Sequence, residues 1–254
     1  LKPIAGGGSK NTMRSQREDE LYAALNILLP SQKNPIQAEE FIQGEEHTME
    51  TVFIKGKAVW QSSTYYLPGP LKVIENPWIQ YCVLLPKEQL KPHAAQFAPQ
   101  NIAALQALGL HTGLSHMEWF HRSKEPKQLV SEVGARPPGV NIMPLMSFAH
   151  GVNMWEKWAE LMVHDSWNIP KRKFATASAF LRAQGAGASI QKIDGITEIK
   201  RRLAPFIKAS SLPKIGQPRS SHYEGDGWIV LQHPETAPLV EALRKVITTI
   251  KISS

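Results

Sequence analysis

The spacing of apolar residues along the chain predicts a mixture of helices and strands. A helical period predicts helices at residues 18–29, 100–108, 152–163 and 237–247. A period of two, or a short apolar run, predicts strands at residues 36–42, 48–54, 58–66, 113–121, 127–135 and 227–231. The Pro-rich segment 67–77 predicts a loop. Together these elements predict an α+β protein whose strands pair mainly antiparallel.

The helix predicted at 152–163 is amphipathic and rich in tryptophan. Its predicted apolar face consists of Val152, Trp155, Trp158, Ala159 and Met162. We expect this face to pack against another lobe or against a second copy of the chain, so the prediction includes a homo-oligomer.

Two glutamates face each other in the hairpin predicted over 113–135. If the hairpin is symmetric about Glu125, Glu118 lies opposite Glu132, and Gly134 and Arg136 alternate onto the same face. Like charges directly opposite each other repel and destabilise a sheet. A bound divalent cation reverses that effect, and paired carboxylates beside an arginine suit Mg²⁺ and a polyphosphate. The alternative is a solvent-exposed Glu pair on a wet sheet face.

Overall composition narrows the class of protein. The chain has 254 residues, of which 42% are hydrophobic and 20% charged, an ordinary balance for a globular protein. Its single cysteine, Cys82, excludes an internal disulfide and predicts a buried thiol in the reducing cytoplasm. No run of about 18 apolar residues is present, which predicts no membrane span. The net charge of +7 attracts phosphates. The basic clusters at 171–173 and 200–202 lack interleaved aromatic residues, which argues against nucleic-acid binding.

Two segments near the start of the chain carry candidate binding chemistry. Lys2 precedes a loop of Gly6, Gly7, Gly8 and Ser9, whose backbone N–H groups can approach an anion closely, although a flexible linker has the same composition. Residues 39–46 place four acids around an apolar pair, on a segment that predicts a strand leading into a turn. Backbone groups of a strand between two lobes suit a purine edge, and an acid suits ribose hydroxyls. The alternative is a solvated edge strand.

With a Lys–Gly loop, an acidic hinge and a Glu pair with Arg in that order, the chain resembles the ATP-grasp superfamily, and specifically its carboxylate–amine ligases. The resemblance covers about residues 1–165 by motif, and its most specific element is Glu-x-x-x-Arg-Pro-x-Gly at 132–139. It implies an ATP-grasp fold in which antiparallel sheets clamp a nucleotide, with a β-rich C-terminal lobe. The implied parts are a small subdomain (1–38), a large subdomain with the metal site (39–180) and an α+β lobe (181–254).

The resemblance also implies which residues bind ATP. They are Lys2, Gly6, Gly7, Gly8, Ser9, Glu39, Glu40, Phe41, Ile42 and Glu46. Lys2 would contact the phosphates beneath the mobile glycine loop. The side chain of Glu39 would hold the adenine amino group, the backbone of the next residues would contact the base, and Glu46 would bind the ribose.

The implied reaction is the activation of a carboxylate by the ATP γ-phosphate. An amine then attacks the acyl phosphate to give an amide or peptide bond, with release of ADP and phosphate. Glu118 and Glu132 would ligate Mg²⁺, with Mn²⁺ as an alternative ion, while Arg136 and Lys2 would act catalytically by stabilising the transferring group. The expected partners are a small-molecule carboxylate and an amine, for example amino acids.

The chain departs from the family pattern at two points. Many relatives carry Asn two residues after the second metal Glu, where this chain has Gly134. The family's first phosphate-binding Lys and its N-terminal domain should precede Leu1, so we expect the chain to lack them. Two other hypotheses therefore stay open, a bicarbonate-using carboxylase or carbamoyl-phosphate-forming relative and a non-catalytic nucleotide-binding module. His116 shares the face of Glu118, and two roles are open for it. It contacts the substrate or the ligands around the metal, or it is a hydrogen-bonded structural histidine.

Overall fold

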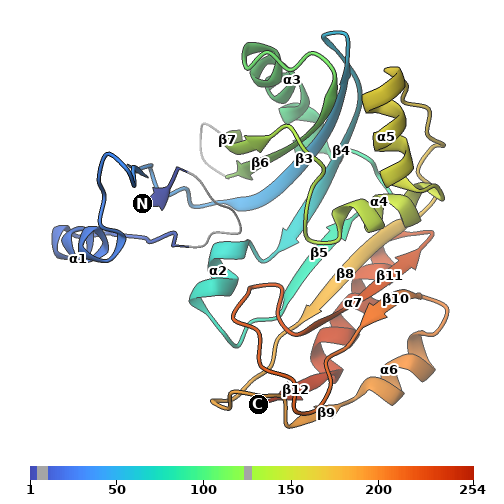
Figure 1. The fold of residues 1–254 in the computed structure, drawn as a ribbon. Coiled ribbons are helices and arrows are strands. Elements are labelled where there is room, and N and C mark those ends of the chain that lie inside the picture. Colours follow the sequence, from blue (N-terminus) through green and yellow to red (C-terminus); the bar gives the residue numbers. More distant parts are fainter. Residues whose placement is uncertain (5–10, 123–127) are drawn as a thin grey trace.

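The centre of the protein is an eight-stranded sheet in which all neighbouring strands are antiparallel (Figure 1). The structure is a computed structural model that describes residues 1–4, 11–122 and 128–254. In spatial order the strands are β10 (Ile207–Ser211), β11 (Gly227–His233), β8 (Ala175–Leu181), β5 (Tyr81–Leu85), β4 (Lys57–Leu67), β3 (Glu45–Ile54), β6 (Gly113–His121) and β7 (Gln128–Gly134). The predicted α+β class and antiparallel pairing are confirmed.

Helices cover both faces of this sheet. The longer helices are α3 (Pro92–Ala107), α4 (Ile142–His150), α5 (Met154–His164), α6 (Ile196–Leu203) and α7 (Thr236–Thr249). Alternate residues of β5 separate the two layers: Val83 and Leu85 join the core beneath α4 and α5, whereas Cys82 and Leu84 join the core beneath α6 and α7. At the β3–β6 end, α3 packs through Phe97, which stacks on Trp119 with ring centroids 4.4 Å apart.

The first residues of the chain form a small unit beside the sheet. Strands β1 (Lys2–Pro3) and β2 (Ile36–Gln37) pair antiparallel, and α1 (Glu18–Leu28) lies between them in sequence (Figure 1). A second two-stranded sheet joins β9 (Lys192–Asp194) to β12 (Lys251–Ser253) near the end of the chain.

Three predicted elements differ in the structure. The strand predicted at 36–42 pairs only at Ile36–Gln37, because the acidic residues that follow have no partner strand in the described chain. The loop predicted at 67–77 contains α2 (Pro70–Glu75), which begins with a proline at its first position, where the missing N–H costs nothing. The helix predicted at 100–108 already begins at Pro92 for the same reason.

The predicted apolar face of the helix at 152–163 is wrong in part: Val152 and Trp158 pack against the core, but other members of the face do not. Trp155 and Met162 are 48% and 53% exposed, while Met154 and Leu161 are fully buried. The helix begins at Met154 after Asn153, whose side-chain oxygen accepts a hydrogen bond from the Trp155 backbone N–H. Only one stripe of a helix can face the sheet, and the sheet selects the stripe at 154, 158 and 161.

The large sheet continues across the boundary predicted near residue 180. Strands β10 and β11, from the predicted lobe 181–254, pair in order with β8 and so share the sheet with residues of 39–180. The division into 1–38, 39–180 and 181–254 stays a prediction. Among the described residues, no helix is long and apolar enough to cross a membrane.

The single thiol is expected to be inert in the native protein. Cys82 is 2% exposed, and burial raises the pKa of its thiol to about 12. Because only the thiolate is nucleophilic, iodoacetamide should label Cys82 only after unfolding in guanidinium chloride. Mass spectrometry of the intact protein measures this, and rapid labelling in native buffer would contradict the burial.

Candidate functional site

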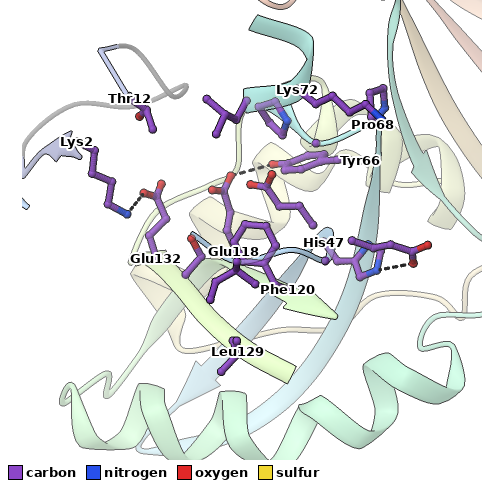
Figure 2. A pocket seen from close by; sticks show the side chains of 18 of the residues that line it. Lys2, Thr12, His47, Tyr66, Pro68, Lys72, Glu118, Phe120, Leu129 and Glu132 are labelled. Carbon is purple, nitrogen blue, oxygen red and sulfur yellow. Dashed lines mark hydrogen bonds and ion pairs between the residues drawn. The ribbon is translucent and has the colours of Figure 1, made fainter. Parts of the chain in front are cut away.

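One cavity of about 1420 Å³ lies between the N-terminal unit and the β3, β4, β6 and β7 end of the sheet. It gathers the described candidate residues from distant parts of the sequence (Figure 2). They are Lys2, Glu39, Glu40, Phe41, Ile42, Glu46, Glu118, Glu132 and Arg136. The candidates Gly6, Gly7, Gly8 and Ser9 lie outside the described residues.

The glutamate pair stands where the hairpin symmetry predicts it. Glu118 of β6 is the direct partner of Glu132 of β7, and His116 is the partner of Gly134. Immediately beyond Glu118 the register shifts, because Trp119 pairs with Val130 and leaves Ser131 as an extra residue. The bulge falls outside the pair, so the two carboxylates keep one face of the sheet.

A third carboxyl group, that of Glu46 on β3, lies in the same cavity as the glutamate pair. Burial, together with the charges of Glu118 and Glu132, raises the pKa of Glu46 to about 8. Burial and the Glu118 charge also raise the pKa of Glu132. Both shifts mean that burial and mutual repulsion disfavour the charged forms of these acids by more than the charge of the nearby Lys2 offsets.

The Lys2 ammonium group lies in the cavity between the acidic hinge and the glutamate pair. Its Nζ lies 2.9 Å from Oε2 of Glu39 and 3.9 Å from Oε2 of Glu132. Lys2 pairs antiparallel with Gln37, and Gln37 lies two residues before Glu39 in the sequence. This pairing brings Lys2 close to Glu39. The sheet of the N-terminal unit thus carries both Lys2 and the start of the acidic hinge to the Glu132 side of the cavity.

The acidic hinge, predicted over 39–46, is only partly a strand: residues 38–43 have no regular strand structure, whereas Glu45 and Glu46 begin β3. Two arginines hold its side chains: Arg122 is 3.2 Å from a carboxylate oxygen of Glu40, and the Arg14 guanidinium lies 3.9 Å above the Phe41 ring. Phe41 itself is 42% exposed. Backbone groups outside a ladder are available for hydrogen bonds to a ligand.

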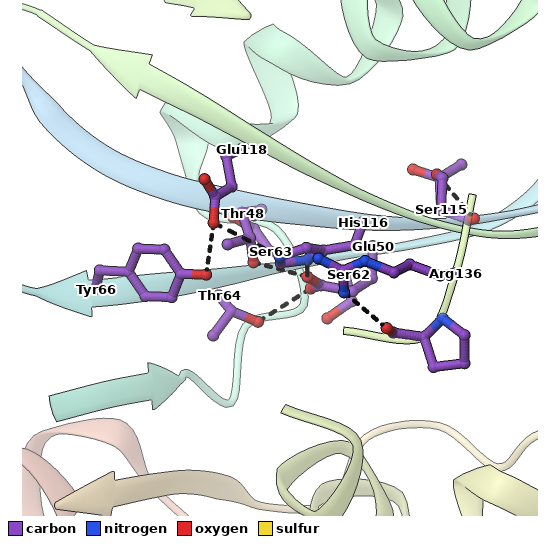
Figure 3. Close-up of polar contacts among 12 residues, drawn as sticks. Thr48, Glu50, Ser62, Ser63, Thr64, Tyr66, Ser115, His116, Glu118 and Arg136 are labelled. Carbon is purple, nitrogen blue, oxygen red and sulfur yellow. Dashed lines mark hydrogen bonds and ion pairs between the residues drawn. The ribbon is translucent and has the colours of Figure 1, made fainter. Parts of the chain in front are cut away.

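Sequence reasoning missed Tyr66, which contacts Glu118 in the cavity, and Glu50, which is buried behind His116. The Tyr66 hydroxyl donates a hydrogen bond to Oε1 of Glu118 at 3.1 Å, and Nε2 of His116 lies 3.7 Å from the same oxygen (Figure 3). Glu50 is fully buried and lies 2.9 Å from Nδ1 of His116. Burial lowers the pKa of His116, but its contacts with Glu118 and Glu50 outweigh this and raise the pKa to about 9. Period-two spacing of 46, 48 and 50 places Glu50 on the Glu46 face, a signal that the sequence does contain.

Gly134 is explained by the arginine beside it. A Cβ at this position would lie 3.2 Å from Nε and 3.3 Å from Cγ of Arg136, closer than ordinary contact. The Arg136 guanidinium donates to the carbonyl of Pro137 at 3.0 Å. Glycine therefore lets Arg136 lie against the strand, in place of the Asn side chain that many relatives carry.

The donor set of the cavity fits a hard divalent cation held together with a ligand. Carboxylate oxygens are preferred by Mg²⁺, which proteins commonly hold by one or two carboxylates plus substrate phosphates. Glu118 and Glu132 provide such a pair of carboxylates. In the part of the chain that the structure describes, no group of three or more His, Cys, Asp or Glu residues is arranged to hold a metal ion alone.

Comparison with known proteins identifies the fold. No family model matches the sequence, and no curated protein matches it. Among solved structures, an L-amino acid ligase from Bacillus licheniformis superposes with a TM-score of 0.73 at 23% identity, over 94% of this chain and 60% of the ligase. The biotin carboxylase domain of a Hydrogenobacter thermophilus 2-oxoglutarate carboxylase, solved with MgADP, ADP and bicarbonate, gives 0.63 at 15% identity, over 99% of this chain and 56% of that chain.

A third solved structure carries the nucleotide itself. A carboxyaminoimidazole ribonucleotide synthase from Aspergillus clavatus, complexed with ATP, gives a TM-score of 0.60 at 13% identity, over 95% of this chain and 60% of the synthase. The chain thus spans about 60% of the length of the structures it matches. Together with the antiparallel sheet and the helices around it, these matches establish that the chain has the ATP-grasp fold.

Proposed function

We propose that this chain carries the nucleotide site of an ATP-dependent ligase that activates a carboxylate as an acyl phosphate for attack by an amine. The observation that carries the proposal is the direct pairing of Glu118 with Glu132 in the cavity that also holds Lys2, the acidic hinge and Arg136. A Glu pair that is merely solvated does not explain why Lys2, Arg136 and the acidic hinge line the same cavity.

The hinge residues would bind the nucleoside. In this proposal the Glu39 carboxylate accepts a hydrogen bond from the adenine amino group. The backbone of Glu40, Phe41 and Ile42 contacts the base, and Glu46 binds the ribose. Residues 38–43 have no strand partner among the described residues, which supports this assignment, because their backbone groups are not used in a described ladder.

The cationic residues would bind the phosphates. Lys2 lies between Glu39 and Glu132, so nucleotide phosphates could take the place of Glu39 as its partner. Arg136 would stabilise charge on the transferring phosphoryl group from the β7 side. The glycines and Ser9 of the loop at 6–9 would cover the phosphates and exclude water, which otherwise hydrolyses the acyl phosphate.

Glu118 and Glu132 would hold Mg²⁺. When bound, the ion neutralises charge that develops on the phosphate oxygens. Mn²⁺ has the same preference for oxygen ligands and is the alternative ion in the proposal. The proposal further places the protein in the cytoplasm, with small-molecule carboxylate and amine substrates such as amino acids, and includes association of two copies through the exposed side of α5.

The test is release of phosphate from Mg·ATP by the purified protein. A panel of amino acids, offered singly and in pairs, should stimulate release, and hydroxylamine should trap the activated carboxylate as a hydroxamate. Stimulation by bicarbonate in place of a larger carboxylate would support the carboxylase alternative. Nucleotide binding without stimulated release by any carboxylate–amine pair would contradict the ligase proposal and support a non-catalytic module.

A further inference from the structure

A carboxylate that cannot touch any ligand lies beneath the candidate cation site. Glu50, in the middle of β3, is 0% exposed. Its carboxylate accepts hydrogen bonds from the hydroxyls of Thr48 at 2.7 Å and Thr64 at 3.0 Å, and Nδ1 of His116 lies 2.9 Å from it. Burying a carboxylate is costly unless it is paired and hydrogen-bonded, and these three contacts come from three neighbouring strands, β3, β4 and β6.

His116 connects this buried acid to the cavity. Its ring is 6% exposed, with Nδ1 at Glu50 and Nε2 at 3.7 Å from Oε1 of Glu118. The Tyr66 hydroxyl binds the same Oε1 at 3.1 Å (Figure 3). The Glu118 carboxylate is thus restrained from two sides, by the histidine of its own strand and by the tyrosine of β4.

The contact between Glu50 and Nδ1 of His116 sets the orientation of the imidazole ring. An imidazole held at one nitrogen has its other nitrogen directed away from that contact, and outer partners of this kind commonly orient the groups that bind a metal. Ser62, the direct partner of Glu50 in the β3–β4 pairing, accepts a hydrogen bond from the buried Arg172.

We propose that Glu50 is a positioning residue for the candidate cation site, which holds the Glu118 carboxylate in place through the His116 ring. The inference rests on the proposed function, because it takes Glu118 as a cation ligand. A purely structural role for Glu50 would affect the stability of the sheet and leave cation affinity unchanged.

Binding of Mn²⁺ to the nucleotide-free protein, followed by the loss of the free-ion EPR signal, tests the proposal without any turnover. Glu50→Gln keeps the shape of the side chain and removes its charge. We expect it to weaken Mn²⁺ affinity about tenfold, as loss of an outer partner typically does. The matched control is Glu241→Gln on α7, where the same change is made to an exposed residue paired with Arg244, and where Mn²⁺ affinity should equal that of the wild type.

A double-mutant cycle distinguishes action through His116 from an independent effect. His116→Asn keeps an amide near the Glu50 contact and removes the arm that reaches Glu118. If Glu50 acts through the ring, adding Glu50→Gln to His116→Asn should change Mn²⁺ affinity by less than about twofold. If Glu50→Gln fails to fold, Thr64→Val removes one hydrogen bond to Glu50 and should give an affinity between those of the wild type and His116→Asn.

Three results would overturn the proposal. The first is a folded Glu50→Gln or Thr64→Val variant with wild-type Mn²⁺ affinity. The second is full additivity of the Glu50 and His116 changes. In both cases the proposed function survives, since the wild type still binds the ion. The third is a wild-type protein that binds no Mn²⁺ even at millimolar concentration and with ADP added, which refutes the cation site and this inference together.

Discussion

Replacing Glu132 by Gln is expected to lower Mg²⁺-dependent ATP turnover by about 100-fold or more, while the chain stays folded. The amide keeps the shape of the side chain but loses the charge that would ligate Mg²⁺, and removing one preorganised partner of a reacting phosphate typically costs this much. The same change relieves the repulsion between Glu132 and Glu118, which are direct partners in the sheet. Metal-free stability should therefore equal or slightly exceed that of the wild type.

Phosphate release and urea unfolding in EDTA measure the two effects separately. Glu198→Gln, an exposed site on α6 that pairs with Arg202, is the matched control and should leave both quantities unchanged. If Glu132→Gln unfolds in metal-free buffer, Glu132 is a structural residue and its assignment as a metal ligand is wrong.

Acid is expected to destabilise the wild type through a histidine that is buried uncharged. His47 is 3% exposed, both its ring nitrogens lack hydrogen-bond partners among the described residues, and it packs against Tyr65 and Trp119. Burial, and then the charges of His93, His121 and Lys91, lower the pKa of His47 to about 3. The Glu45 carboxylate, 3.6 Å from Nε2, does not reverse the shift.

The sign of the effect follows from where the proton binds. Below about pH 6.5 the unfolded chain protonates this histidine and the folded chain does not. The contribution of His47 to stability is therefore complete above pH 6.5 and is lost as the pH falls from 6.5 toward 3. At pH 5 the loss amounts to about 2 kcal/mol, a large part of the stability of a typical domain.

The variant His47→Phe isolates this contribution. Other groups titrate in the same range: His150 also has a pKa lowered by burial, to about 4, whereas the raised pKa of Glu46 acts in the opposite direction. Both cancel when wild type and variant are compared at each pH. The free energy of unfolding in urea should thus shift in favour of His47→Phe by about 2 kcal/mol between pH 7 and pH 5.

A solvent-exposed histidine provides the control for this experiment. The matched control is His164→Phe at the exposed end of α5, which makes the same change of side chain away from the buried His47 site. A parallel pH dependence of the wild type and His47→Phe would mean that His47 titrates normally in the folded protein.

The local pattern of apolar and polar residues predicted several strands of the large sheet. Period-two alternation placed β6 and β7 nearly to the residue, and the symmetry of the hairpin paired Glu118 with Glu132 without any tertiary information. This works because register in an antiparallel hairpin depends on the turn and the alternation of faces, which are both local. The apolar stripe of α5 was predicted only in part, because several stripes of that helix are apolar and packing against the sheet decides which of them is buried.

The sequence by itself determined the antiparallel α+β class, the opposed glutamates and the order of the candidate motifs. Only the tertiary structure decided that Lys2, the hinge and the hairpin line one cavity, since Lys2 and Glu132 are joined by packing rather than by any local spacing. It also placed Glu50 against His116 and Tyr66 against Glu118, because these contacts cross from β3 and β4 to β6. Contacts between distant strands depend on the strand order of the sheet, and no local periodicity encodes that order.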